Sequence, residues 1–220
     1  MRAPRGFLID YGGTLVEERE YNPRAGIELL LSHATHRSPH ATLDAVLARA
    51  DRITREVAQH RDQFQIETPW ASLTRLIHDY FRTRFDAPLA ELELPFWNAA
   101  VRTHPMPGAR DAMRELHRRG MSMGVVSNSS FGQRVIRHEL AKHGLDEHFT
   151  IVVVSAEYAV RKPNPLLFEI AAARLGIDVR DVWFVGDRLD TDITGGRLAG
   201  MSTVWYAPHG EGKGTRRILS

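Results

Sequence analysis

A single carboxylate ends the first apolar run of this 220-residue chain, and that feature constrains the fold more than any other. The stretch FLIDYGGTL begins at Phe7, places Asp10 directly after three apolar residues, and continues with two glycines and Thr14. This pattern predicts a short buried strand that ends at an acid, followed by a tight turn, because glycine lets the backbone approach a ligand closely. Open α/β sheets bind ligands at the carboxyl ends of their strands. We therefore expect Asp10 to lie in the functional site.

The second half of the chain alternates between two kinds of segment. The expected strands are 121–127, 150–154, 182–185 and 202–206, and the expected helices are about 109–119, 132–143, 165–175 and 191–199. Such alternation is typical of parallel βαβ units, whose right-handed crossovers bring the carboxyl ends of the strands to one edge. The expected fold is α/β, with a parallel-sheet, Rossmann-like three-layer core.

Residues 16–104 interrupt this alternation directly after the first strand. Apolar residues with helical spacing predict four helices, at about 23–38, 42–60, 69–85 and 94–101. We expect an all-helical cap domain at 16–104, inserted over the edge of a core made of residues 1–15 and 105–220. The glycines and few apolar residues after Pro208 predict a loose tail.

Composition narrows the classes of function. The chain has 29 basic and 27 acidic residues and a net charge of +2, which gives no case for nucleic-acid binding, since that needs a clustered basic face. It has no cysteine, which excludes disulfides and thiolate zinc sites. No apolar run suits a signal peptide or a membrane span. We expect a cytoplasmic protein, monomer or homodimer, that binds neither nucleic acid nor a membrane.

Several polar residues at the expected strand ends suit phosphoryl chemistry. Asp10, Asp187 and Asp192 offer hard oxygen ligands without histidine or cysteine, a set that favours Mg²⁺ over zinc. Ser127 offers a hydroxyl and the backbone N–H groups that follow it can hold an anion, while Lys162 offers a compact positive charge for a phosphate oxygen. A carboxylate nucleophile, a divalent cation, a hydroxyl and a lysine can together hold and transfer a phosphoryl group.

The chain resembles the haloacid dehalogenase-like hydrolase superfamily over residues 6–15 and 105–206. Four motifs carry the resemblance in the same order: Asp10 to Thr14, Ser127-Asn128, Lys162-Pro163, and Gly186-Asp187 through Asp192. The resemblance implies a Mg²⁺-dependent phosphomonoesterase that acts on a small phosphorylated metabolite through an aspartyl-phosphate at Asp10. It also implies that the insert is a helical cap, which closes over the substrate and excludes water.

The resemblance also assigns roles to individual residues. Asp10, Ser127 and Lys162 are the implied catalytic residues. The implied metal ligands are the carboxylates of Asp10, Asp187 and Asp192 and the carbonyl of Gly12. The implied substrate-binding residues are Ser127, Asn128 and Lys162, together with Thr14, which braces the loop.

One position departs from the family pattern. Phosphatases of this family usually carry a second Asp two residues after the nucleophile, as the general acid–base, and here that residue is Gly12. General acid–base help contributes ~10²–10⁴-fold to rate. Glu17 or Glu18, which follow the first motif closely, are candidate substitute acids.

The missing acid leaves other functions open. One alternative is a non-catalytic phosphate-binding or regulatory module. Another is a dehalogenase, although dehalogenases of this family use no metal and this chain keeps both Asp187 and Asp192. Phosphonoacetaldehyde hydrolases need a cap lysine, and no lysine lies between residues 16 and 104. A phosphatase is the favoured prediction.

Overall fold

The central element of the fold is a six-stranded sheet, seen in a computed structural model that describes residues 3–207 and 217–219. The strand order is β10-β9-β8-β1-β6-β7. Five strands are parallel, and β10 is antiparallel to β9. The bounds are β1 (Gly6–Ile9), β6 (Ser122–Ser127), β7 (Ile151–Val154), β8 (Val182–Gly186), β9 (Ser202–Trp205) and β10 (Arg217–Leu219). The predicted α/β class with a parallel sheet is confirmed.

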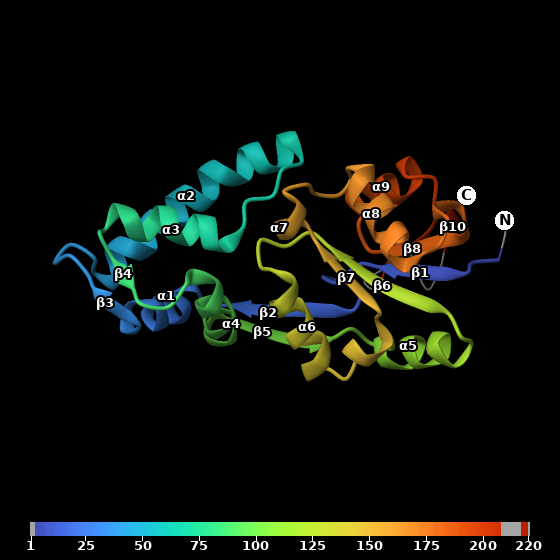
Figure 1. Ribbon diagram of the computed structural model, residues 1–220, viewed down its shortest axis with the longest axis horizontal. Helices are drawn as coiled ribbons and strands as arrows, with labels where there is room; N and C mark the ends of the chain where they lie inside the picture. The colour runs from blue at the N-terminus through green and yellow to red at the C-terminus, as the bar shows by residue number, and fades with distance from the viewer. Residues whose placement is uncertain (1–2, 208–216, 220) are drawn as a thin grey trace.

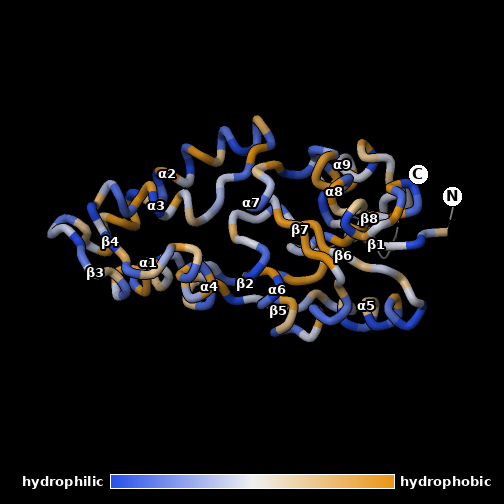
Figure 2. Tube along the Cα trace, viewed as in Figure 1, coloured by the Kyte–Doolittle hydropathy of each residue, from blue (hydrophilic) through white to orange (hydrophobic). Residues whose placement is uncertain are grey.

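Helices cover both faces of this sheet, which makes three layers (Figure 1). On one face lie α5 (Ala109–Arg118) and α6 (Gln133–Lys142), and on the other lie α8 (Pro165–Leu175) and α9 (Thr194–Leu198). Successive residues of β1 serve the two faces, as expected for the two-residue period of a strand. Ile9 packs in the core with α5 and α6, and Leu8 packs in the core with α8 and α9. Strand β7 is hydrophobic along its length (Figure 2), and β6 is hydrophobic at Met123, Val125 and Val126, as expected for strands covered on both faces.

The pairing of β1 determines where its final acid lies. Ile9 aligns with Val125 of β6 on one side and with Val185 of β8 on the other. The Asp10 N–H then donates to the Val185 carbonyl at 2.9 Å. The parallel register therefore places Asp10 at the same sheet edge as the ends of β6 and β8, as the sequence predicted.

The segment between β1 and α5 contains four helices that share a hydrophobic core of their own. Their bounds are α1 (Pro23–Ser32), α2 (Leu43–Phe64), α3 (Trp70–Tyr80) and α4 (Leu89–Ala100). The predicted existence of four helices is correct, but α1 ends about six residues early, α3 ends before Phe85, and α4 begins five residues before Leu94. Phe131 and Val135, which follow β6, pack into the same hydrophobic core.

The expectation that residues 16–104 are all helical is wrong in two places. β2 (Val16–Tyr21) pairs antiparallel with β5 (Val101–Pro105), and β3 (Ala34–His36) pairs with β4 (Arg84–Phe85). In β2 only Val16 is fully buried, so the strand lacks the alternation of apolar and polar residues by which a strand is recognised. Pairing with a distant segment, which satisfies the backbone groups, makes it a strand.

Two expectations concern the ends and the division of the chain. Residues 208–216 and 220, most of the predicted loose tail, lie outside the described residues, whereas 217–219 pair with β9 as β10. The division into a core of 1–15 and 105–220 and a cap of 16–104 stays a prediction. Among the described residues, no helix has the length and apolar character needed to cross a membrane.

Candidate active site

Asp10 and Lys162 form the centre of the site. The Lys162 ammonium donates to Asp10 Oδ1 at 2.5 Å and to the Val126 carbonyl at 3.0 Å, and it lies 2.7 Å from Asp192 Oδ1. The Thr14 hydroxyl donates to the other oxygen of Asp10 at 3.2 Å. Both charged residues are buried, with 6% of Asp10 and 3% of Lys162 exposed. The Asp10 carboxylate is therefore held at both oxygens, one by an ammonium and one by a hydroxyl.

Asp187 and Asp192 bring further negative charge to the same place. One carboxylate oxygen from each of Asp10, Asp187 and Asp192 lies within 4.8 Å of the others. We call these three residues and Lys162 the carboxylate cluster. Burial raises the pKa of Asp10 most strongly; Lys162 opposes this, Asp192 and Asp187 add to it, and the resulting pKa is about 7. Burial and the Asp192 charge likewise raise the pKa of Asp187. One ammonium does not balance three carboxylates.

The donor set of the carboxylate cluster fits a hard divalent cation. Asp187 Oδ1 is buried and has no hydrogen-bond partner among the described residues, so it is an oxygen available to a ligand. Carboxylate oxygens without nitrogen or sulfur are the ligands that Mg²⁺ prefers. The three predicted carboxylate ligands are therefore brought together, in an arrangement that suits the predicted metal.

The two glycines of the first motif differ in what they permit. Gly13 has φ +78°, and a Cβ there would lie 2.5 Å from Asp187 Oδ2, so a side chain at 13 would displace the Asp187 carboxylate. Gly12 has no such constraint, because a Cβ built on it meets no atom within 4 Å. The structure therefore has room for the acid that the sequence lacks at position 12.

Asn128 holds the backbone of Lys162 in place. Its side-chain Nδ2 donates to the Lys162 carbonyl at 3.0 Å, and its Oδ1 accepts from the Lys162 N–H at 2.8 Å. Ser127 is buried at the end of β6 and lines the same cavity as Asp10. Thr14 is not among the cavity-lining residues, because its hydroxyl is directed to Asp10. The substrate-binding roles of Thr14, Ser127, Asn128 and Lys162 stay predictions.

A cavity of 510 Å³ opens beside the carboxylate cluster. Its walls come from the sheet edge, from β2 and from the C-terminal end of α2, and nearly all of them are polar or charged. The lining residues are Asp10, Tyr11, Gly12, Glu18, Arg61, Asp62, Gln65, Ser127, Asn128, Ser129, Arg161, Lys162, Pro163, Arg188, Asp190, Thr191 and Asp192. Such a lining suits a small polar molecule.

A second buried ionic group ties the α2–α3 connection to the sheet edge. Glu67 is 3% exposed; its Oε2 pairs with the Arg161 guanidinium and accepts from the Ser155 hydroxyl at 2.7 Å. The same hydroxyl accepts from the Ser129 N–H at 2.9 Å. We call Glu67, Ser155 and Arg161 the docking cluster. It holds loops that contain Ser129 and Arg161, two residues of the cavity wall.

Sequence reasoning missed several residues of this site. Arg61, Gln65 and the docking cluster belong to no motif, and Arg61, Gln65 and Glu67 come from residues 16–104. Arg188 lies within the fourth motif but was assigned no role. Gln65 ends α2 with φ 54°, a conformation that its residue type does not indicate. The available signals were Arg161, which directly precedes the lysine of the third motif, and Arg188, which directly follows Asp187 of the fourth.

Comparison with known proteins agrees with this geometry. The family model described as haloacid dehalogenase-like hydrolase matches residues 4–200. The chain is 30% identical over 181 residues to a glyceraldehyde 3-phosphate phosphatase of Pyrococcus abyssi, covering 74% of each chain. It is 34% identical over 115 residues to a phosphoserine phosphatase of Thermus thermophilus, covering 52% of this chain and 45% of the relative.

The fold also matches solved structures. A 2-haloacid dehalogenase from Pseudomonas syringae superposes with a TM-score of 0.66 at 20% identity, covering 98% of this chain and 91% of that one. At that identity the likeness concerns the fold alone. The family model, which spans most of the chain, and the archaeal relative together lead to one conclusion: the chain belongs to the haloacid dehalogenase-like hydrolases.

Proposed function

We propose that this hydrolase is a Mg²⁺-dependent phosphomonoesterase that acts on a small, soluble phosphorylated metabolite. The observation that carries the proposal is the carboxylate cluster at the wall of a polar cavity, with Asp10 held at both carboxylate oxygens beside Ser127. The names of the relatives, two of which are phosphatases of small phosphorylated compounds, support it.

Each residue has a stated task in the proposed reaction. Asp10 attacks phosphorus, the bond from phosphorus to the leaving oxygen breaks, and an aspartyl-phosphate forms. Lys162 holds the attacking carboxylate of Asp10 and offsets its negative charge. Asn128 holds Lys162 in place through hydrogen bonds to its backbone N–H and its carbonyl. The Ser127 hydroxyl and the backbone N–H groups after it hold phosphoryl oxygens. Water then attacks the same phosphorus and releases phosphate from Asp10.

The residues that would hold Mg²⁺ are Asp10, Asp187, Asp192 and the carbonyl of Gly12. Their fit rests on the oxygen donor set, on the separation of the three carboxylates and on the unpartnered Asp187 Oδ1. When bound, Mg²⁺ supplies positive charge that offsets the negative charge of the phosphoryl oxygens.

The proposal extends to residues 16–104, which we assign as a cap on the sheet edge. Arg61 and Gln65 from the end of α2 line the cavity together with Asp10 and Ser127 from the sheet. The docking cluster and the Trp70 N–H, which donates to the Ser130 carbonyl at 2.8 Å, join this segment to the sheet-edge loops. A cavity with walls from two such parts can enclose a substrate and exclude water.

Two alternatives have less support. A dehalogenase is less well supported, because nearly all the described residues that line this cavity are polar or charged, with Tyr11 and Pro163 as the main exceptions. A non-catalytic phosphate-binding module is suggested by Gly12 alone. The arrangement of Asp10, with both oxygens held in place, is that of a prepared nucleophile and supports catalysis.

The test is hydrolysis of p-nitrophenyl phosphate by the wild type and by Asp10→Asn, each with Mg²⁺ and with EDTA. We expect hydrolysis by the wild type with Mg²⁺ and none above background in the other three cases. Equal rates for the wild type and Asp10→Asn would overturn the proposal. Binding of phosphate esters without turnover would support the binding module, and metal-independent halide release from a haloacid would support the dehalogenase.

A further inference from the structure

With glycine at position 12, the proposed reaction lacks a general acid for the leaving group. When the bond from phosphorus to an alkyl ester oxygen breaks, the leaving alkoxide is strongly basic and takes up a proton. Gly12 has no side chain that could donate a proton, and apart from its chain neighbours no atom lies within 4 Å of the Cβ position there. The acid has to come from another residue that reaches this open part of the cavity.

Most acids that line the cavity are already paired with cations. Asp62 lies 3.0 Å from Arg61, and Asp190 lies 2.8 Å from Arg188. These arginines lower the pKa of both carboxyls, so both stay ionised and are poor proton donors. Asp10 and Asp192 pair with Lys162.

Glu18 is the exception among these lining acids. It lines the cavity together with Gly12, and within the described part of the chain no hydrogen bond or ion pair engages its carboxylate. Glu18 lies on the exposed part of β2, where desolvation by the neighbouring protein atoms, and then the charge of Glu139, raise the pKa of its carboxyl. A carboxyl with a raised pKa and no cationic partner is able to hold a proton and give it up.

The pairing of β2 brings Glu18 to the open side of Gly12. The Gly13 N–H donates to the Val16 carbonyl at 2.9 Å, and Gly12 forms an isolated bridge with Val16. Glu18 is two residues further along β2, about 7 Å away, and projects from the same side as Val16. A glutamate side chain from that position can extend back over the space that a side chain at 12 would fill.

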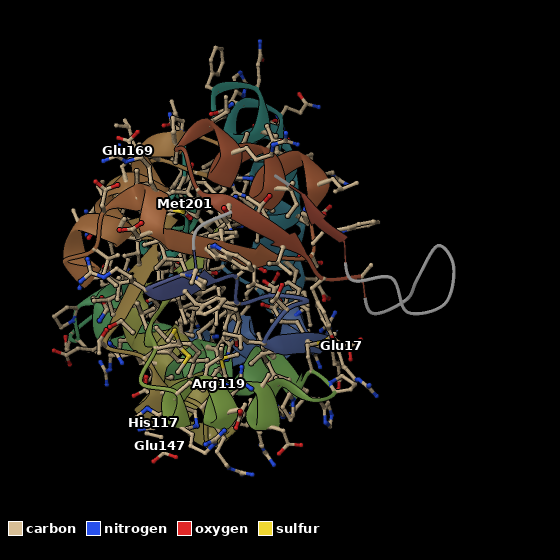
Figure 3. All side chains as sticks on the ribbon, turned by 90° about the vertical axis from the view of Figure 1, so that its right-hand side faces the viewer. Glu17, His117, Arg119, Glu147, Glu169 and Met201 are labelled. Atoms are coloured by element: carbon tan, nitrogen blue, oxygen red, sulfur yellow. The ribbon has the colours of Figure 1, made fainter. Side chains whose placement is uncertain are left out.

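Glu17, the neighbouring candidate, is placed differently. It projects from the other side of β2, its carboxylate accepts from Arg19 at 2.8 Å, and it does not line the cavity. Figure 3 shows Glu17 at the edge of the molecule. The structure thus separates two adjacent glutamates that the sequence could not tell apart.

We propose that Glu18 is the general acid–base catalyst of this site and supplies from β2 the function that Gly12 lacks. The inference rests on the proposed phosphatase function. As Asp10 attacks phosphorus, the Glu18 carboxyl donates its proton to the leaving oxygen, which departs as an alcohol. The Glu18 carboxylate then accepts a proton from the water that attacks the aspartyl-phosphate. Phosphate is released, and Asp10 and Glu18 return to their starting states.

The test compares two esters with different leaving groups. p-Nitrophenolate leaves without a proton, whereas the alkoxide of glycerol phosphate needs one. Glu18→Gln is expected to lower kcat/KM for glycerol phosphate by ~10²–10⁴-fold and to leave kcat/KM for p-nitrophenyl phosphate nearly unchanged. It is also expected to give a burst of p-nitrophenol with accumulation of phosphorylated Asp10, because water activation is slowed as well. The matched control Glu17→Gln should behave as the wild type with both esters.

A second variant keeps the test decisive. Since Gly12 has room for a side chain, Gly12→Asp in the Glu18→Gln background should restore hydrolysis of glycerol phosphate and abolish the burst. Equal losses of kcat/KM for both esters, or no loss for glycerol phosphate, would overturn the role of Glu18 while Asp10-dependent hydrolysis of p-nitrophenyl phosphate still stood. Failure of the wild type to hydrolyse either ester would overturn the proposed function itself.

Discussion

Arg161 and Lys162 are neighbours in the chain, yet they enter two buried ionic groups of different character. In the docking cluster, Arg161 faces one carboxylate, that of Glu67, and the Ser155 hydroxyl takes part in the same contact. In the carboxylate cluster, Lys162 pairs with Asp10 and Asp192, and Asp187 adds a third carboxylate close to these two. The first group is balanced in charge, whereas the second keeps an excess of negative charge and an unpartnered oxygen on Asp187.

This difference separates a structural group from a binding group. A balanced, hydrogen-bonded ion pair has little to gain from a further ligand, and its loss leaves a charge buried without a partner. Buried excess charge is unfavourable by itself and is relieved by a proton or by a cation. Burial first, and then the charges of Asp192 and Asp187, raise the pKa of Asp10 to about 7 against the opposing effect of Lys162. We therefore expect substitutions in the two clusters to act on different measurements.

The largest expected effect follows removal of the cation from the carboxylate cluster. Lys162→Met leaves Asp10 without its 2.5 Å partner and adds to the excess negative charge. We expect kcat/KM for p-nitrophenyl phosphate to fall by ~10²–10³-fold, the usual result of removing one oriented donor. The measurement is steady-state kinetics with saturating Mg²⁺. Retention of wild-type kcat/KM would show that the two clusters do not differ as described.

Substitutions in the docking cluster should lower the stability of the fold. Glu67→Gln removes the carboxylate that pairs with the largely buried Arg161 guanidinium, which should lower the free energy of unfolding by about 3 kcal/mol, or the Tm by about 6–12 °C for a chain of this size. Denaturant and thermal unfolding measure it. The control is Glu56→Gln, which removes an exposed pair with Arg52 and should leave the free energy of unfolding nearly unchanged. A similar small change for Glu67→Gln would mean that the cluster is dispensable.

The stabilisation of the fold by Mg²⁺ should depend on the carboxylate cluster and not on the docking cluster. Mg²⁺ at about 100 times its Kd stabilises a protein with one site by about 2.7 kcal/mol, and we expect this increment in the wild type and in Glu67→Gln. Asp187→Asn should abolish it, since Asp187 supplies the unpartnered oxygen. Asp190→Asn, a nearby acid already paired with Arg188, should keep it. Thermal unfolding across a Mg²⁺ titration is the measurement, and an increment that survives in Asp187→Asn would remove the proposed metal site.

The sequence predicted which residues meet at the sheet edge, and it did so for a physical reason. The strand ending at Asp10, the Ser127 motif and Asp187 are each set by local patterns, and the parallel sheet brings those strand ends to one edge whatever the details. The position of Lys162 depends in addition on the conformation of the loop after β7, which Asn128 holds in place. Short motifs were enough to predict these positions, because in each one the reactive side chain and the residues that determine the local backbone are neighbours in the sequence.

The rest of the site depends on contacts between distant segments. Glu67 and Arg161 are 94 residues apart in the chain, and no local pattern indicates that they meet. The pairing of β2 with β5 was missed for the same reason, and with it the fact that Glu18 faces the cavity and Glu17 does not. Sequence periodicity reveals a strand when one of its faces is buried, and β2 is largely exposed beyond Val16. Its sequence therefore shows no strand pattern.

The smallest expected effect is the change in stability over one pH unit in the absence of metal. The pKa of Asp10 is raised from 3.8 to about 7 in the folded protein, so between these values the folded state binds more protons than the unfolded state. The free energy of unfolding should therefore fall as pH rises from about 4 to about 7, by at most ~1.4 kcal/mol per pH unit from this group. Unfolding of the wild type and Asp10→Asn in EDTA isolates the contribution, because the variant cannot titrate at position 10.

Mg²⁺ should reverse the sign of this pH dependence, since a cation favours the ionised carboxylates and binds more weakly as pH falls. A difference between the wild type and Asp10→Asn that does not change with pH would show that Lys162 alone suffices to keep Asp10 ionised, and the contrast in charge between the two clusters would then be smaller than their composition indicates.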